Sequence, residues 1–266
     1  MASAALLLIG LLATGGAYAA FTTSATAETG AHVAKLADEG QKLFAANCAS
    51  CHGLNAEGTD NGPTLIGVGA AAVDFQVGTG RMPMAASGPQ APEKTPQFTD
   101  EQVAALATYV ASLGPGPAVP DEGDYSLEGL SDEEREAAIV RGGQIFLTNC
   151  TACHNFEGSG GAMPRGGYAP NIRGVEPRYI YEALLTGPQN MPNFSNGNLS
   201  PDEKRDVIAY LYSLRDMPSY GGFGLGGLGP VTEGLAAWLL GIGGLVGAAV
   251  WIAAHTTRTT RKKDAA

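Results

Sequence analysis

Two short strings of the form Cys-x-x-Cys-His limit what this chain can fold into more than any other feature. They occupy residues 48–52 and 150–154 and contain all four cysteines of the 266-residue chain. On a helix, positions i, i+3 and i+4 share one face, so two thiols can form thioethers with a porphyrin while the histidine reaches its iron. The pattern predicts two covalently attached haem c groups and no disulfide. The residues expected to hold them are Cys48, Cys51, His52, Cys150, Cys153 and His154.

The same residue types leave two other uses of these strings open. Cysteine and histidine are common zinc ligands, and paired cysteines can form a redox centre. The strings could form a pair of zinc knuckles, or one zinc site could draw its ligands from both strings. Each string carries its own histidine directly after the second cysteine, however, and this favours haem attachment.

The residues around the two strings repeat each other, and the second string follows the first by 102 residues. In each half a phenylalanine precedes the first cysteine by four residues, and a proline loop, a Met-Pro pair and a capped amphipathic helix follow. The matched positions are Phe44 and Phe146, Pro63 and Pro170, Met82 and Met191, and predicted helices at 99–113 and 200–214. A shared order of parts along both halves indicates two copies of one small helical domain.

In this order of parts each half resembles class I cytochrome c. The resemblance implies an all-α fold class with two tandem domains, at residues 30–114 and 131–216, joined by a linker at 115–130. It also implies that the backbone carbonyls of Pro63 and Pro170 orient the haem-ligating histidines.

The resemblance further implies that Met82 and Met191 are the axial ligands of the two irons, since each begins a Met-Pro pair. Thioether ligation raises the potential of haem iron relative to ligation by two histidines. Met84 lies two residues beyond Met82 and remains an alternative ligand. The other methionines and histidines are expected to be structural or exposed, namely Met163, Met217, His32 and His255.

Both ends of the chain predict a membrane protein. Residues 235–254 carry no charged side chain and are long enough to cross a bilayer as a helix. The tail at 255–266 is basic, so the positive-inside rule places it in the cytoplasm and both haem domains on the outer side of the cell membrane. Residues 1–27 form a second apolar stretch, either a retained anchor or a cleaved signal peptide. The Gly-rich segment at 217–234 is either a flexible tether or an extended segment lying on a partner.

The net charge of −10 restricts the possible partners. An acidic surface repels a phosphate backbone, so nucleic acid is not expected as a partner. The negative charge either favours positively charged protein partners or serves only to keep the chain soluble. Residues 85–98 are inserted between the first Met-Pro pair and its final helix, and they form either a docking loop or a plain surface loop. No nucleophile, general acid or phosphate-binding loop is recognised, so no bond-making site is expected on this chain.

The whole arrangement resembles the di-haem cytochrome cc subunit of actinobacterial menaquinol:cytochrome c reductase. The resemblance implies an electron-transfer subunit of a respiratory oxidoreductase and translocase. It would pass electrons from the Rieske iron–sulfur protein to a haem-copper cytochrome c oxidase within a supercomplex, with cytochrome b as a further partner. Two alternatives remain open. One is a cytochrome c subunit of another membrane complex, such as a dehydrogenase or a cbb-type oxidase, and the other is a di-haem peroxidase.

Overall fold

A computed structural model describes residues 2–217 and 234–263 of the chain. Contacts divide the chain into two compact units. The first unit comprises Met1–Ser126 together with Glu176–Pro201, and the second comprises Leu127–Val175 together with Asp202–Ala266. The first unit therefore includes a stretch of the second sequence repeat. Most of the predicted Gly-rich segment, residues 218–233, lies outside the described residues.

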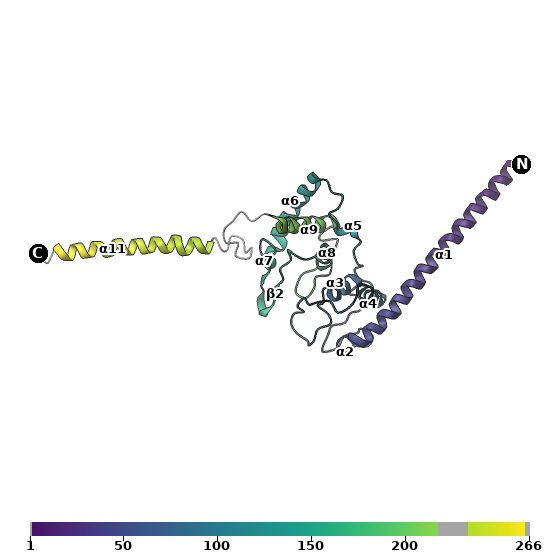
Figure 1. Cartoon of the computed structure of the whole chain (residues 1–266), viewed down its shortest axis with the longest axis horizontal. Helices are drawn as coiled ribbons and strands as arrows, with labels where there is room; N and C mark the ends of the chain where they lie inside the picture. The colour runs from purple at the N-terminus through teal and green to yellow at the C-terminus, as the bar shows by residue number, and fades with distance from the viewer. Residues whose placement is uncertain (1, 218–233, 264–266) are drawn as a thin grey trace. The chain divides into compact units, whose positions relative to one another are not determined.

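Helices make up almost all of the regular structure, and the expected all-α fold class is confirmed (Figure 1). The first unit holds α1 (Ala2–Asn47), α2 (Ala49–His52), α3 (Ala70–Gly78), α4 (Asp100–Ser112), α5 (Glu122–Tyr125) and α8 (Pro177–Thr186). The second unit holds α6 (Asp132–Asn149), α7 (Thr151–His154), the 3-10 turn η1 (Pro164–Gly166), α9 (Pro201–Asp216), the π-helical η2 (Ala237–Ile242) and α11 (Gly243–Lys263). One two-stranded antiparallel ladder was not expected, in which β1 (Gly161–Ala162) pairs with β2 (Tyr168–Ala169).

Side-chain caps start the helices where the sequence predicts them. Thr99 accepts a hydrogen bond from the backbone of Gln102, and the Gln102 side chain accepts one from the backbone of Thr99, so a complete capping box begins α4. Ser131 and Glu134 form the same box at the start of α6. A cap of this kind contributes roughly 1 kcal/mol because it satisfies backbone N–H groups that the first helical turn leaves unpaired.

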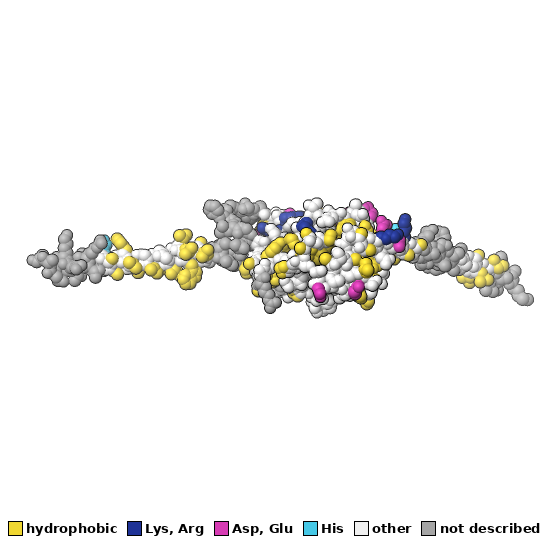
Figure 2. Space-filling view, turned by 90° about the horizontal axis from the view of Figure 1, so that it is seen from below, with side chains coloured by type: hydrophobic (Ala, Val, Ile, Leu, Met, Phe, Trp, Pro, Cys, Tyr) yellow, Lys and Arg dark blue, Asp and Glu magenta, His cyan; other side chains and the backbone are white. Residues whose placement is uncertain are grey.

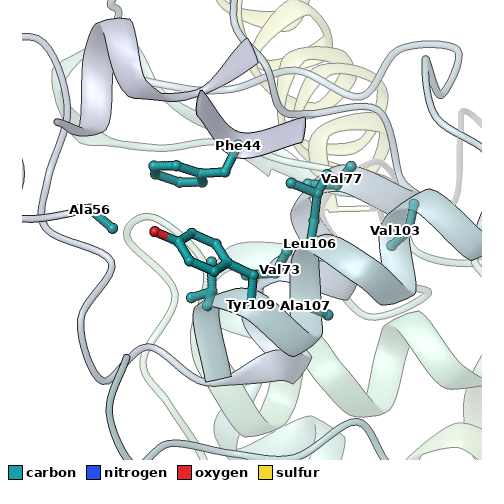
Figure 3. Close-up of a cluster of buried hydrophobic side chains, with 9 residues drawn as sticks. Phe44, Ala56, Val73, Val77, Val103, Leu106, Ala107 and Tyr109 are labelled. Carbon is teal, nitrogen blue, oxygen red and sulfur yellow. The ribbon is translucent and has the colours of Figure 1, made fainter. Parts of the chain in front are cut away.

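The core of the first unit forms where α1 crosses α4. Gly40 faces the backbone of Ala105 so closely that a Cβ at this position would collide with it. Four residues later, the ring of buried Phe44 packs on Tyr109 with 5.3 Å between ring centroids. Figure 3 shows these two rings at the centre of the buried cluster, beside Ala56. Full burial of a side chain such as Phe44 contributes roughly 1.5–3 kcal/mol.

The second unit repeats this crossing between α6 and α9. Gly142 lies against the backbone of Asp206, and buried Phe146 packs on Tyr210 with a centroid distance of 5.4 Å. Arg141, next to the crossing glycine, forms a two-point ion pair with Asp206 at 2.7 and 2.9 Å. The internal repeat recognised in the sequence is thus also a repeat of packing geometry.

The helix at the N-terminus extends beyond the segment predicted there, whereas the helix near the C-terminus contains the predicted membrane span. α1 is continuous from Ala2 to Asn47, so no break in the helix separates the predicted segment at 1–27 from the residues that follow. Near the C-terminus, Gly234–His255 is 22 residues long and apolar enough to cross a membrane, and it is the one such helix among the residues searched. In Figure 2 the described part of this helix shows mainly hydrophobic side chains (yellow) and groups of the white class. The predicted span at 235–254 falls within it.

Candidate haem sites

The first Cys-x-x-Cys-His string lies where α1 gives way to the short helix α2. Cys48 donates its backbone N–H to the carbonyl of Phe44 over 2.8 Å, and His52 donates to the carbonyl of Cys48 over 3.0 Å. Cys48 also packs against the buried cluster around Phe44. The string therefore forms one further helical turn after α1, and this turn sets the positions of its two thiols and its imidazole.

The second string has the same local geometry. Cys150 donates its N–H to the carbonyl of Phe146 over 2.9 Å, and His154 donates to the carbonyl of Cys150 over 2.9 Å. A residue with positive φ ends the helical turn in both copies, Gly53 in the first and Asn155 in the second. Glycine adopts this left-handed conformation freely, and asparagine is among the few other residues that tolerate it.

Both histidines are nearly buried, and a proline carbonyl holds each ring. Nδ1 of His52 lies 2.8 Å from the carbonyl oxygen of Pro63, and Nδ1 of His154 lies 3.1 Å from that of Pro170. A carbonyl only accepts hydrogen bonds, so Nδ1 must carry the proton and Nε2 keeps its lone pair for a metal. This is the contact that the cytochrome c resemblance implies, and it is present in both copies.

Burial changes the acid–base properties of three side chains in the two strings, Cys48, Cys150 and His154. Burial, and then the neighbouring cysteine, raises the pKa of both Cys48 and Cys150 to about 11, so these thiols are neutral at pH 7. Burial lowers the pKa of His154, although its hydrogen bond to Pro170 acts in the opposite direction. The imidazole is therefore neutral, which is its ligating form. Within residues 2–217 and 234–263, no group of three or more His, Cys, Asp or Glu could hold a metal ion.

Met82 is placed better than Met84 to complete the first site. Half-buried Met82 packs against the same cluster that Cys48 contacts, and its backbone N–H donates to the carbonyl of Gln76 over 2.8 Å. The methyl group of Met84 instead lies over Gly88 in the inserted segment, because a Cβ at Gly88 would sit 3.6 Å from it.

A hydrogen bond and an ion pair connect the inserted residues 85–98 to the Met82 loop. Lys94 donates from Nζ to the carbonyl of Pro83 over 2.8 Å, and Glu93 lies 3.4 Å from the buried guanidinium of Arg81. Arg81 stacks on the ring of Phe75, 4.8 Å from its centroid. Nothing in the sequence pattern predicts a buried arginine at this position. This part of the insert therefore supports the loop that carries Met82.

Met191 lies in the segment that the contacts assign to the first unit, whereas His154 lies in the second unit. The Met191 loop begins where Gly187 ends α8 in the left-handed conformation, and its backbone is closed by a 2.7 Å bond from Phe194 N–H to the carbonyl of Leu184. Ligation by Met191 remains a prediction.

The other methionines and histidines lie where a structural or exposed role was expected. Met163 is half-buried and donates its backbone N–H to the carbonyl of Gly167 next to the ladder, over 2.8 Å. Met217 is exposed beyond the end of α9, His32 is exposed on α1, and His255 is exposed near the end of the apolar helix.

Comparison with protein families assigns both halves to cytochromes. The family described as Cytochrome c matches residues 37–114, and the family described as Cytochrome C oxidase, cbb3-type, subunit III matches residues 137–211. Each matched segment contains one Cys-x-x-Cys-His string and the aromatic crossing beside it.

Relatives that extend over most of the chain carry one shared description. The cytochrome bc1 complex cytochrome c subunit of Corynebacterium diphtheriae is 48% identical over 229 residues, covering 83% of this chain and 82% of that protein. The protein of the same description from Corynebacterium efficiens is 45% identical and covers 96% and 90%, respectively. That from Mycobacterium tuberculosis is 45% identical and covers 94% and 90%. This chain therefore belongs to the family of cytochrome bc1 complex cytochrome c subunits.

Proposed function

We propose that this chain is the membrane-anchored di-haem electron-transfer subunit of a respiratory menaquinol:cytochrome c reductase. The observation that carries the proposal is the duplicated Cys-x-x-Cys-His turn, with a proline carbonyl on Nδ1 of each histidine. When bound, each haem c cycles between ferric and ferrous iron and so carries one electron. The chain thus acts as part of an oxidoreductase, with no bond-making chemistry of its own.

Different residues of each domain would hold different parts of a haem c. Cys48, Cys51, Cys150 and Cys153 would attach it covalently, while His52 and His154 would offer Nε2 to the iron. Pro63 and Pro170 keep the imidazoles in the tautomer that ligation needs. Met82 and Met191 would supply thioether sulfur as a further ligand, which would raise the potential of the iron.

The partners in this proposal are the other subunits of the reductase and the oxidase that receives the electrons. The chain would accept electrons from the Rieske iron–sulfur protein beside cytochrome b and deliver them to a haem-copper cytochrome c oxidase. A net charge of −10 favours association with basic partner surfaces. The helix Gly234–His255 supports membrane anchoring, and the basic residues after it support an orientation with both haem domains outside the cytoplasm.

Purification from its native membrane in mild detergent tests the proposal. A tagged chain should retain two haems after acid–acetone extraction, as read by mass spectrometry, and should co-purify with cytochrome b, a Rieske protein and oxidase subunits. The double substitution Cys150→Ala/Cys153→Ala should leave one haem, and Cys48→Ala/Cys51→Ala should do the same. Co-purification with a dehydrogenase, or with a cbb-type oxidase alone, would contradict the assignment.

A further inference from the structure

Three charged residues that lie far apart in the sequence meet inside the first unit. Asp74 on α3 and Glu182 on α8 are buried, with side chains 4% and 0% exposed, and Arg178 on α8 is about one-third exposed. The guanidinium of Arg178 forms an ion pair with Asp74 through Nη2, and its Nε lies 3.4 Å from Glu182. A buried carboxylate is costly unless it is paired, so Asp74 depends on Arg178.

Glu182 does not compete with Asp74 for this single positive charge. Burial, and then the proximity of Asp74, raises the pKa of Glu182 to about 9, so its carboxyl group is neutral at pH 7. Its Oε2 has no hydrogen-bond partner among the described residues. Arg178 and Asp74 are therefore the charge-balanced pair of the cluster.

Apolar contacts extend the pairing of α8 with α3. The ring of Tyr179 meets Phe75 edge-on, with 6.3 Å between centroids. The hydroxyl of Tyr179 lies where a Cβ on Gly78 would project, so the end of α3 fits closely against α8. α3 leads directly into the Met82 loop, and α8 leads into the Met191 loop.

A second connection joins the two loops beyond the helices. Gln189, two residues before Met191, donates from Nε2 to the carbonyl of Ala91 over 3.1 Å. Ala91 is buried within the insert that lies over the Met82 loop. Gln189 has a φ of 59°, a conformation that costs free energy for a non-glycine residue, so tertiary contacts must hold it. The stretch from α8 to Met191 is thus attached at both ends to residues of the first repeat.

We propose that Asp74 is a positioning residue for the Met191 loop, which it holds through Arg178 and α8. The inference rests on the proposed function in that Met191 serves as an axial ligand. It makes a residue of the first repeat responsible for ligation in the second repeat.

The substitution Asp74→Asn in the full haem-bearing chain tests the inference, because it keeps the side-chain size and removes the charge. It should lower the midpoint potential of the haem that Met191 ligates and reduce the long-wavelength absorption typical of methionine-ligated ferric haem. Combining it with Met191→His should produce no further change at that haem. Hydrogen exchange of amides between residues 177 and 194 should become at least about tenfold faster. Breaking a buried ion pair lowers the local free energy of opening by more than the amount that corresponds to a tenfold change in rate.

Two further variants keep the test decisive. Gln189→Asn tolerates the positive φ but is too short to reach Ala91, and it should move the same signals in the same direction while leaving the buried cluster intact. Asp38→Asn removes a carboxylate paired with Lys42 on the exposed face of α1 and should change none of them.

The proposal is overturned if the second haem keeps its potential and absorption in Asp74→Asn and in Gln189→Asn, with exchange as slow as in the unsubstituted chain. If Asp74→Asn does not fold, Gln189→Asn alone decides by the same criteria. Absence of methionine ligation at the second haem of the unsubstituted chain would instead contradict the proposed role of Met191. In that case the exchange rates still show whether Asp74 holds the loop.

Discussion

Main-chain and side-chain groups contribute differently to the two haem sites. The imidazoles are oriented by carbonyl oxygens of Pro63 and Pro170, which a side-chain substitution cannot remove. The proposed ligation by methionine would depend on one sulfur atom in each domain, and nothing in the backbone could replace it. Met82 and Met191 are therefore the positions where we expect a single substitution to change the electronic properties of one site while the fold is kept.

We expect Met82→His and Met191→His each to lower the potential of one haem, because imidazole stabilises ferric iron more than thioether sulfur does. Each should also remove that haem's share of the methionine-dependent absorption. Redox titration monitored by absorption measures both effects. Met84→His is the control and should leave both haems unchanged, since Met84 lies over Gly88. A change at the first haem in Met84→His but not in Met82→His would show that Met84 is the ligand.

Helix crossings at glycine are the feature that the two repeats share most closely. Gly40 on α1 and Gly142 on α6 each allow the partner helix to approach until its backbone fills the space of a Cβ. The aromatic pairs Phe44–Tyr109 and Phe146–Tyr210 then pack beside the crossing at nearly equal distances, 5.3 and 5.4 Å. Helix packing this close cannot accept even one added methyl group without movement of the helices.

We expect Gly40→Ala to destabilise the chain by about 1–3 kcal/mol, because overpacking at the crossing outweighs the better helix propensity of alanine. Gly30→Ala is the matched control on the same helix, since a Cβ at Gly30 meets nothing within 4 Å. It should leave stability unchanged or raise it by up to about 1 kcal/mol. Thermal unfolding followed by circular dichroism distinguishes them, and equal melting temperatures for both variants would contradict the crossing geometry.

The pairing of α3 with α8 predicts a pH dependence of stability. The pKa of Glu182 is about 9 in the folded chain against an ordinary value of 4.5, so between these values the folded state binds more protons than the unfolded state. The contribution of Glu182 to stability is then largest below pH 4.5 and declines as the pH rises towards 9. Glu182→Gln cannot lose a proton, so this decline should disappear.

The free energy of unfolding of Glu182→Gln, measured relative to the unsubstituted chain, should therefore increase from pH 5 to pH 9. Denaturant titrations at both pH values give this difference directly. Glu203→Gln is a suitable comparison because it changes the same chemical group at an exposed position of α9. A constant difference across this range for Glu182→Gln would show that Glu182 is already ionised at pH 5.

Across the whole chain, the units of packing do not coincide with the units of sequence repetition. The family matches end the first repeat at residue 114 and place the second at 137–211, whereas the contacts assign Glu176–Pro201 to the first unit. The segment that carries Met191 is thus stabilised by residues of the first repeat. The limits 30–114 and 131–216 that the sequence predicts for the two cytochrome c domains remain predictions.

The orientation in the membrane can be tested on intact cells from which the wall has been removed. Protease added outside should digest residues 30–216 and spare a tag placed after the C-terminus, because the basic residues at 258–263 favour the cytoplasmic side. Immunoblotting for the tag and staining for covalent haem report the two sides separately. Lysed cells should lose both signals, and a tag digested while the haem signal survives would reverse the orientation.

Rules that act over a few residues were enough to specify the haem-attachment turns, the capped starts of α4 and α6, the apolar C-terminal helix and the repeat itself. Spacing within a helical turn, capping boxes and hydropathy are all read locally, so the sequence shows them directly. The ion pair between Arg178 and Asp74 joins residues 104 positions apart, and the bond from Gln189 to Ala91 spans 98. Such partners depend on how α3 and α8 meet after folding, and no local pattern encodes that. The same reason explains why the buried Arg81 and the membership of Glu176–Pro201 in the first unit emerge only from tertiary packing.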